Sequence, residues 1–413
     1  MSMNGKRTAN FGAPPAKQSR MDDDDDDQFE EDLALLEELE AEGQGDGLDM
    51  MDVDAPGVDD ETSGSNVKWA RPPLPHIDPK NDSVSFQQLE LDYYIGTHME
   101  GMPGATKGPT PVVRMSGVTM DGNSVMAHIH GFTPYFFVPA QSGFKREDCE
   151  KFKNALDMLV KKDLRSNREG IVEAVLAVDH VMKESIYCYH GNRKNPFLKI
   201  TVALPRLIAP AKRMLEQGFV CPGYSQHAFQ TYESNIDFEI RFMTDTHVVG
   251  CNWIELPAGK YHVRKSGQHG ISSSGTGLPM VSRCQLEVDI SWEDFISHPA
   301  EGEWSKVAPF RILSFDIECA GRRGVFPEPN KDPVIQIANM MIRQGDSEPF
   351  IRNVFTLKSC APVVGSQVLS YDTEFELLQT TTCPMISPAT YIPTINVNNL
   401  FKLTVLCHYL PGI

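Results

Sequence analysis

The stretch FRILSFDIE, residues 310–318, decides how the C-terminal part of the chain is expected to fold. Its apolar residues predict a buried β-strand. The two-residue period of a strand places Ser314, Asp316 and Glu318 on one face, opposite Phe315 and its apolar neighbours. The two carboxylates, at positions i and i+2, therefore project side by side with their backbones about 7 Å apart.

This pair of acids suggests a particular chemistry. Two like charges buried together are unfavourable unless cations cancel them. Mg²⁺ and Mn²⁺ prefer carboxylate oxygens, and two such ions about 4 Å apart activate a water and stabilise the leaving oxygen of a phosphodiester. Asp316 and Glu318 are therefore candidate catalytic and metal-ligating residues for phosphoryl transfer. The alternative is that both acids are polar residues that end the strand at solvent.

Two more strands are expected after a loop at residues 319–332, at 333–342 and 350–357. Short connections make the three strands an antiparallel meander led by the strand with the acids. Such a meander resembles the start of an RNase H-like nuclease domain.

The N-terminal end of the chain carries most of the net charge of −18. Residues 22–61 contain 20 acidic and no basic residues, and the first twenty residues carry +4, which leaves −2 for the remainder. This composition predicts a disordered tail over residues 1–80. Basic groups at 6–7 and 14–20 match a two-part nuclear import signal or a solubilising end. Residues 28–42 have helical periodicity, which indicates a partner-docking helix or a transient one.

Cysteine usage and hydropathy exclude several protein classes. The nine cysteines include no C-x-x-C pair, which favours a reduced intracellular compartment over a disulfide framework or a zinc module. The chain has no signal-peptide stretch and no run of about 18 apolar residues, so we expect neither a secreted nor a membrane-spanning protein.

Residues 81–304 predict an α+β domain, because many short apolar segments bounded by Gly and Pro surround two helical ones. Lys and Arg outnumber Asp and Glu by 15 to 10 over residues 145–216, which indicates either a nucleic-acid surface or ordinary charged helix faces. Helices are expected at 146–164 and 206–217, and a loop at 266–282. The strand candidates are 84–91, 112–118, 124–130, 135–138, 172–181, 197–203, 236–243 and 284–290.

Two groups within this domain are possible binding residues. His128 and His130 share one face of a predicted strand, but no third metal ligand is near them in sequence, so a structural role is preferred. A cluster of aromatic residues would stack on bases or pack in the core, and core packing is expected for at least half of it. These residues are Phe132, Tyr135, Phe136 and Phe137.

The run SFDIECAGRRGVFPEPNKDPVIQIAN, residues 314–339, resembles the first exonuclease motif of family B DNA polymerases. Blocks at 86–92, 128–140, 197–218, 238–261 and 298–311 extend the resemblance over residues 84–379. It implies a nuclear replicative polymerase that binds primer–template DNA, nucleotides and accessory subunits. It also implies OB-like and RNA-recognition-like units at 81–304, followed at 305–379 by the start of an RNase H-like 3′–5′ exonuclease domain. In the family the Asp and Glu of this motif bind Mg²⁺ or Mn²⁺, a role that carries over to Asp316 and Glu318.

The resemblance stops after Gln379. The family continues with an Asn-x-x-x-Phe-Asp motif and a Tyr-x-x-x-Asp motif, whereas the divergent tail at 380–413 contains no Asp or Glu. Polymerase motifs and C-terminal cysteine pairs are also missing. The leading interpretation is the N-terminal part of a replicative polymerase, which by itself binds metal weakly and neither extends nor digests DNA. A non-catalytic short isoform that binds DNA or replication partners is the alternative, and the missing acids argue against an independent exonuclease.

Removing residues 1–65 is expected to tighten DNA binding, because the acidic tract repels phosphates or takes their place on basic surfaces. The measurement is the affinity of the full and the shortened chain for a labelled oligonucleotide over a range of salt concentrations. Equal affinity at every salt concentration would contradict the prediction.

Overall fold

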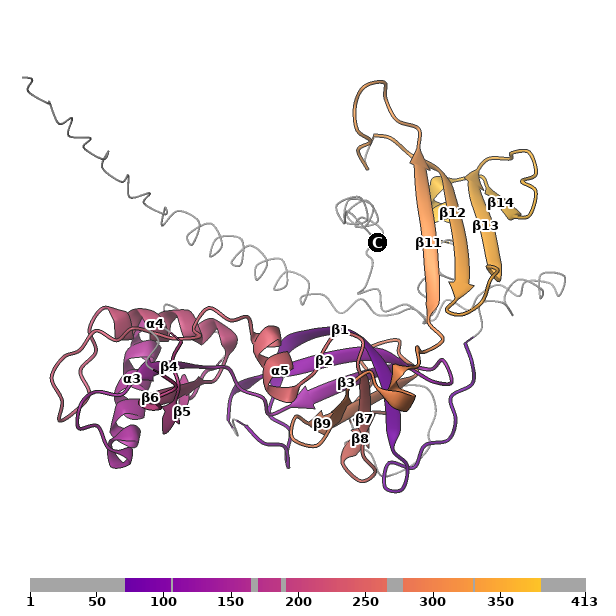
Figure 1. The fold of residues 1–413 in the computed structure, drawn as a ribbon. Helices are drawn as coiled ribbons and strands as arrows, with labels where there is room; N and C mark the ends of the chain where they lie inside the picture. The colour runs from indigo at the N-terminus through magenta and orange to yellow at the C-terminus, as the bar shows by residue number, and fades with distance from the viewer. Residues whose placement is uncertain are drawn as a thin grey trace, which may run out of the picture. The chain divides into compact units, whose positions relative to one another are not determined.

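The computed structural model describes residues 71–104, 107–164, 170–186, 191–265, 278–329 and 331–379. The predicted import signal, the acidic helix at 28–42, most of the predicted disordered tail and residues 380–413 lie outside these ranges. Within them the chain forms sheets of seven, four and three strands (Figure 1).

The seven-stranded sheet is built around a meander of three long strands. Its order is β10-β7-β1-β2-β3-β9-β8, antiparallel except for the β3–β9 pair. The side chains of Phe238 and Phe242, on helix α5 (Phe238–Thr246), belong to its apolar core. The strands are β1 (Val84–Thr97), β2 (Pro109–Thr119), β3 (Ser124–His130), β7 (Trp253–Leu256), β8 (Tyr261–Val263), β9 (Leu286–Ser291) and β10 (Ile296–His298).

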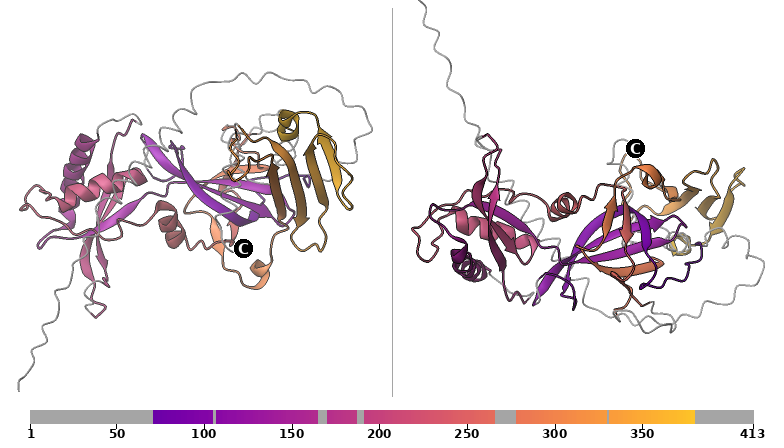
Figure 2. Two further views of the ribbon diagram at one scale, coloured as in Figure 1. Left: turned by 90° about the horizontal axis from the view of Figure 1, so that it is seen from above. Right: turned by 60° about the horizontal axis from the view of Figure 1, so that its bottom comes forward.

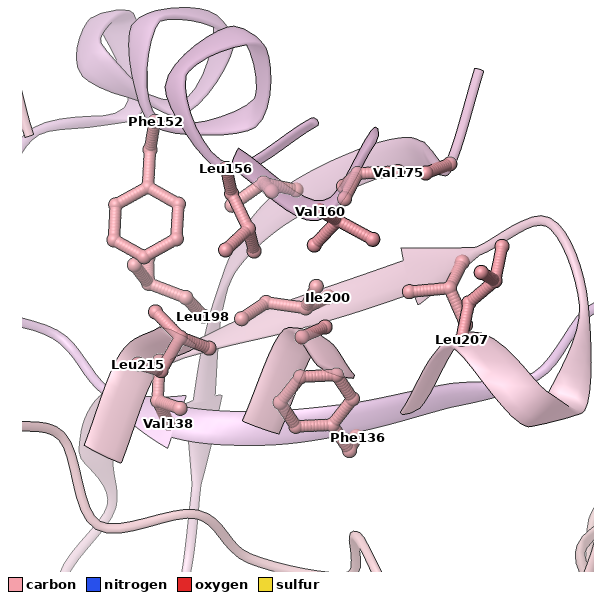
Figure 3. Close-up of a cluster of buried hydrophobic side chains, with 14 of the residues drawn as sticks. Phe136, Val138, Phe152, Leu156, Val160, Val175, Leu198, Ile200, Leu207 and Leu215 are labelled. Atoms are coloured by element: carbon pink, nitrogen blue, oxygen red, sulfur yellow. The ribbon is translucent and has the colours of Figure 1, made fainter. Parts of the chain in front are cut away.

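The three-stranded sheet carries two helices on one face (Figures 1 and 2). Its antiparallel order is β4-β6-β5. Phe152, Leu156 and Val160 recur every four residues on α3 and are fully buried, because this spacing puts them on one side of the helix (Figure 3). The elements are β4 (Tyr135–Pro139), η1 (Arg146–Asp148), α3 (Cys149–Asp163), β5 (Val175–Lys183), β6 (Asn195–Val202), η2 (Pro205–Leu207) and α4 (Ile208–Glu216).

The four-stranded sheet follows a short 3₁₀ turn, η3 (Gly302–Ser305). Its strands β11 (Arg311–Cys319), β12 (Val334–Arg343) and β13 (Ile351–Leu357) form the antiparallel meander that the sequence predicts. A fourth strand, β14 (Gln367–Tyr371), pairs in parallel with β13. Only four residues are buried in its core cluster, namely Val334, Ile337, Phe355 and Leu377.

The prediction of a strand at 236–243 is wrong, because this segment contains helix α5. Phe238 and Phe242 are buried, whereas Ile240 between them is 52% exposed, as a helical period requires. The apolar pattern alone fits either structure, since residues four apart share a face in both. Asp237 at the N-cap and His247, with φ +57° at the C-cap, bound the helix.

The other predicted strands and helices are present, with shifts of a few residues at their ends. Strands β7, β8, β10 and β14, of three to five residues, have no counterpart in the prediction. Residues 266–277 of the predicted loop lie outside the described ranges.

Gly117 is expected to tolerate no side chain. A Cβ at this position in β2 would lie 2.3 Å from the carbonyl oxygen of Gln87 and 2.4 Å from the ring of Phe86. Gly117→Ala should therefore lower the free energy of unfolding by about 1 to 3 kcal/mol, measured by urea denaturation. Gly250→Ala is the matched control, because nothing lies within 4 Å of a Cβ there. Equal stability of the two variants would show that β1 and β2 can separate to make room.

Candidate functional site

Asp316 and Glu318 lie on the same face of strand β11, as the sequence predicts. In the β11–β12 register Asp316 is opposite Ala338 and Glu318 is opposite Gln336. Residues opposite each other in register share a face, so the acids stand beside a small side chain and an amide. The Ile317 backbone N–H donates to Asp316 Oδ1 at 3.0 Å, which fixes that carboxylate.

The prediction that strand β11 is buried is wrong. Exposed residues alternate with partly covered ones along β11, and both acids are exposed. Ile312 on the same face is 44% exposed, and Met340 of β12 is 47% exposed. On the other face, Ile317 packs against the small core cluster of this sheet. Because water solvates both carboxylates, the described structure needs no cation to hold them together.

Two of the acids that follow in sequence, Asp332 and Asp372, have partners of their own. Asp332 is 1% exposed and accepts from Arg322 Nε at 3.0 Å and from the Glu328 backbone N–H at 2.8 Å. The guanidinium of Arg322 is the main cause that lowers the pKa of Asp332. Asp372 faces Lys358 at 3.3 Å on the surface. These contacts stabilise the loop before β12 and the end of the sheet, and they engage both acids away from the pair.

The described residues fit one part of a metal site. A Mg²⁺ ion takes six oxygen ligands in near-octahedral geometry, and Asp316 and Glu318 supply carboxylates of the right kind. Among the residues that the structure describes, no group of three or more His, Cys, Asp and Glu is arranged to hold a metal ion. A complete two-metal site therefore needs ligands in addition to this pair.

The two histidines of β3 belong to a buried polar network. His128 Nε2 lies 2.9 Å from Glu287 Oε1, and His130 Nε2 lies 2.8 Å from Asp289 Oδ1. Arg264 holds Asp289 in a two-pronged ion pair, with Nε to Oδ2 at 2.9 Å and Nη2 to Oδ1 at 2.7 Å. All five residues are at least 93% buried. The structural role preferred for the histidines is thus what their contacts show.

Hydrogen bonding decides the charge states in this network. Burial by itself would raise the pKa of Glu287, but His128, Ser282 and the Val281 backbone N–H lower it to about 2. Burial acts likewise on Asp289, whose bonds to His130 and Arg264 lower its pKa to about 2. Both carboxylates are therefore ionised in the folded chain.

The acidic half of this network was missed from the sequence. Glu287 and Asp289 are spaced i and i+2 in the strand candidate 284–290, the same spacing as the histidines in 124–130. Two predicted strands with polar pairs at equal spacing are a signal for pairing between them. The β3–β9 register brings the two pairs together.

Most of the aromatic cluster packs in the core, as expected. Phe132, Phe136 and Phe137 are 4%, 0% and 7% exposed. Two cations lie close to the ring of Tyr135, with Lys199 Nζ 3.9 Å and the Arg241 guanidinium carbon 4.5 Å from its centroid.

The basic segment at 145–216 contains several ion pairs on its helices. Four of the cations on α3 and α4 pair with neighbouring acids, as expected for solvated helix faces. The pairs are Lys151–Asp148, Lys153–Glu173, Lys161–Asp157 and Arg213–Asp163.

Comparison with known proteins gives two matching family models. Residues 229–408 match the exonuclease domain of DNA polymerase family B, and residues 131–209 match the N-terminal domain of DNA polymerase delta catalytic subunit-like proteins. The chain belongs to family B of the DNA polymerases. Family B exonuclease domains use divalent metal ions in general.

The curated relatives are DNA polymerase delta catalytic subunits. The one from Drosophila melanogaster is 50% identical over 378 residues, that from Mesocricetus auratus 46% over 376, and that from Arabidopsis thaliana 47% over 322. These alignments cover 91%, 89% and 77% of this chain and 33%, 33% and 28% of the relatives. The chain thus spans about a third of the length of the relatives it matches.

A solved structure of the family B DNA polymerase from the archaeon Pyrobaculum calidifontis is similar to part of this chain. The alignment covers 73% of this chain and 29% of the archaeal chain. Its TM-score is 0.45 and its sequence identity 20%. Among the described residues, the helices are too short or too polar to cross a membrane.

The free energy of unfolding is expected to fall as the pH drops from 6 towards 3. Glu287 and Asp289 have pKa values of about 2 in the folded chain and about 4 when unfolded. Their stabilisation is therefore complete above the unfolded value and is lost as the pH falls towards 2. In Glu287→Gln the change between pH 6 and pH 3 should be smaller by about 1 to 2 kcal/mol, measured by urea titration.

Glu293→Gln is the control for this prediction, because Glu293 is an exposed acid just beyond β9. It should keep the pH dependence of the unchanged chain. A Glu287→Gln variant with the same pH dependence as the control would mean that the network contributes no acid sensitivity.

Proposed function

We propose that the chain provides the N-terminal region and the first metal-binding strand of the proofreading 3′–5′ exonuclease in a replicative DNA polymerase of the delta type. The observation that carries the proposal is the projection of Asp316 and Glu318 from one exposed face of β11, inside the segment that matches the family B exonuclease model. The substrates are primer–template DNA and nucleotides, the partners are the accessory subunits of the polymerase, and the site of action is the nucleus.

The role of each acid follows from its position. Asp316 and Glu318 would each give carboxylate oxygens to Mg²⁺ or Mn²⁺. When bound, such ions activate water and stabilise the leaving oxygen in phosphodiester hydrolysis. The two side chains need no rearrangement of β11 to approach one cation, because the strand already presents them side by side. Ligands beyond this pair complete the site, so the chain by itself should bind the metal weakly and should not digest DNA.

The domain organisation belongs to the same proposal. Residues 81–304 are assigned to the polymerase N-terminal domain, 305–379 to the start of the exonuclease domain and 380–413 to a divergent tail, with the import signal in the segment before them. The disordered tail predicted over 1–80 does not include residues 71–80, because the Pro72 carbonyl oxygen accepts hydrogen bonds from the side chains of Asn123 and Gln285. The order β4-α3-β5-β6-α4 with sheet order β4-β6-β5 supports an RNA-recognition-like unit. The β1-β2-β3 meander with a shared core supports an OB-like unit.

A second candidate function is non-catalytic binding of DNA or of replication partners by a short isoform. The lack of a third metal ligand beside the pair, among the residues that the structure describes, favours it. The two functions differ in whether Asp316 matters, since a binding protein has no use for the pair.

The test is a titration of the full chain with Mn²⁺, with free ion followed by electron paramagnetic resonance. We expect weak binding that Asp316→Ala abolishes and that Asp346→Ala, at an exposed turn, leaves unchanged. Equal binding by all three chains would refute the metal-binding role and favour the non-catalytic function.

A parallel assay follows release of 3′ nucleotides from labelled primed DNA in Mg²⁺ or Mn²⁺. We expect none from the chain alone. Release that Asp316→Ala removes would show that the site is already complete, contrary to the proposal that it needs further ligands.

A further inference from the structure

Strand β11 forms one edge of the four-stranded sheet, and β14 forms the other (Figure 1). β11 is nine residues long and pairs on one side only, with β12. Between Arg311 and Glu318 it has no proline and no shift of register. About half of the backbone N–H and C=O groups of such a strand point away from its partner. A long edge of this kind is a template on which another strand can pair.

Directly after β14, the chain crosses the sheet towards β11. Glu374 lies three residues beyond β14, and its Oε1 accepts a hydrogen bond of 2.8 Å from the backbone N–H of Val334, the first residue of β12. Burial raises the pKa of the Cys319 thiol of β11, and the nearby Glu374 carboxylate raises it further. The chain has therefore passed β13 by Glu374. From there the edge at β11 is one strand away, and the edge at β14 is two.

The strand directions make β11 a suitable partner for a strand that follows. β13 and β14 are parallel, and β12 is antiparallel to both β11 and β13, so β11 runs in the same direction as β14. Residues 374–379 are helical, and Leu377 is fully buried in the core cluster on the face of Ile317. Two strands of one sheet that are joined through a helix run parallel to each other. A strand after this helix would therefore run parallel to β14 and to β11.

The sequence after the helix contains a candidate for this strand. The odd-numbered residues of FKLTVLCHYL, residues 401–410, are all apolar or aromatic, and Lys402, Thr404 and His408 alternate with them. This alternation is typical of a strand. The 29 residues 372–400 between it and β14 are enough for a crossover, which needs about a dozen. The match to the family B exonuclease model extends to residue 408, so it includes most of this segment.

The charges of the two edges favour β11. Residues 380–413 contain one Lys and no Asp, Glu or Arg. Asp316 and Glu318 are the only charged residues of β11 after Arg311, whereas β14 has no charged residue. A segment with one cation and a row of apolar side chains thus suits an edge with two carboxylates on one face and Ile317 on the other.

We propose that residues 401–410 add to the outer edge of β11 as a fifth, parallel strand. The odd-numbered side chains of this strand continue the face of Ile317, and Lys402 lies on the face of Asp316 and Glu318. The added strand covers an edge that is otherwise open to a second copy of the chain. The inference does not depend on metal binding at β11.

Hydrogen exchange of the full chain, followed by mass spectrometry of its peptides, tests the added strand. Val405→Pro removes a backbone N–H and fixes φ in the middle of the segment. We expect the β11 amides that point away from β12 to exchange slowly in the unchanged chain and at least tenfold faster in Val405→Pro. Ala389→Pro lies outside residues 401–410 and is the matched control, which should exchange like the unchanged chain.

Two results of this measurement would overturn the proposal. Equal exchange at β11 in all three chains would mean that residues 401–410 do not pair there. A loss of protection confined to β14 would place them at the other edge. Circular dichroism checks the folding of each variant, and if Val405→Pro does not fold, the cross-linking experiment decides.

A carbodiimide, which joins a carboxylate to an amine in contact with it, tests the orientation of the added strand. Lys402 is the only lysine of residues 380–413. We expect a link from Lys402 to Asp316 or Glu318 that is absent from Lys402→Gln. No link, or links from Lys402 to other acids only, would overturn the orientation. Links found only between chains in a mixture of ¹⁵N-labelled and unlabelled protein would mean that β11 pairs with a second copy, contrary to the proposal.

Discussion

The two-residue alternation of side chains along a β-strand is the constraint on which both polar sites depend. In β11 it sends Asp316 and Glu318 to one face. In β3 and β9 it does the same for the two histidines and for Glu287 and Asp289. A shift of register by one residue would reverse every one of these faces. Strand register therefore determines which of these polar side chains lie side by side.

The two pairs of acids differ in burial, and therefore in what stabilises their charges. Glu287 and Asp289 are fully buried and stay ionised only because His128, His130, Arg264 and several backbone donors compensate for lost hydration. Asp316 and Glu318 are exposed, so hydration stabilises their charges. No ion pair described above involves either of them. The first pair is thus committed to structure, whereas the second remains available to a ligand.

The sequence was sufficient for most of the regular structure, and the failures have physical causes. The strands with alternating or continuous apolar side chains and the two helices with an apolar stripe were found because each pattern lies within its own segment. Helix α5 was misassigned, since Phe238 and Phe242 satisfy both periods and only the exposure of Ile240 separates them. Strand β14 was missed because a five-residue parallel strand depends on its partner β13 rather than on its own pattern.

The candidate site was predictable only in part, for a related reason. The spacing of Asp316 and Glu318 gives their common face, but solvent exposure depends on which surfaces pack against the sheet. The apolar residues of β11 suggested two covered faces, whereas the core cluster of this sheet contacts only the face of Ile317 and Phe355. The buried network of the β3 histidines could not be predicted from either strand alone, since its acids lie 159 residues further along the chain. Local patterns determine which side chains share a face, and the tertiary pairing determines which faces enclose a site.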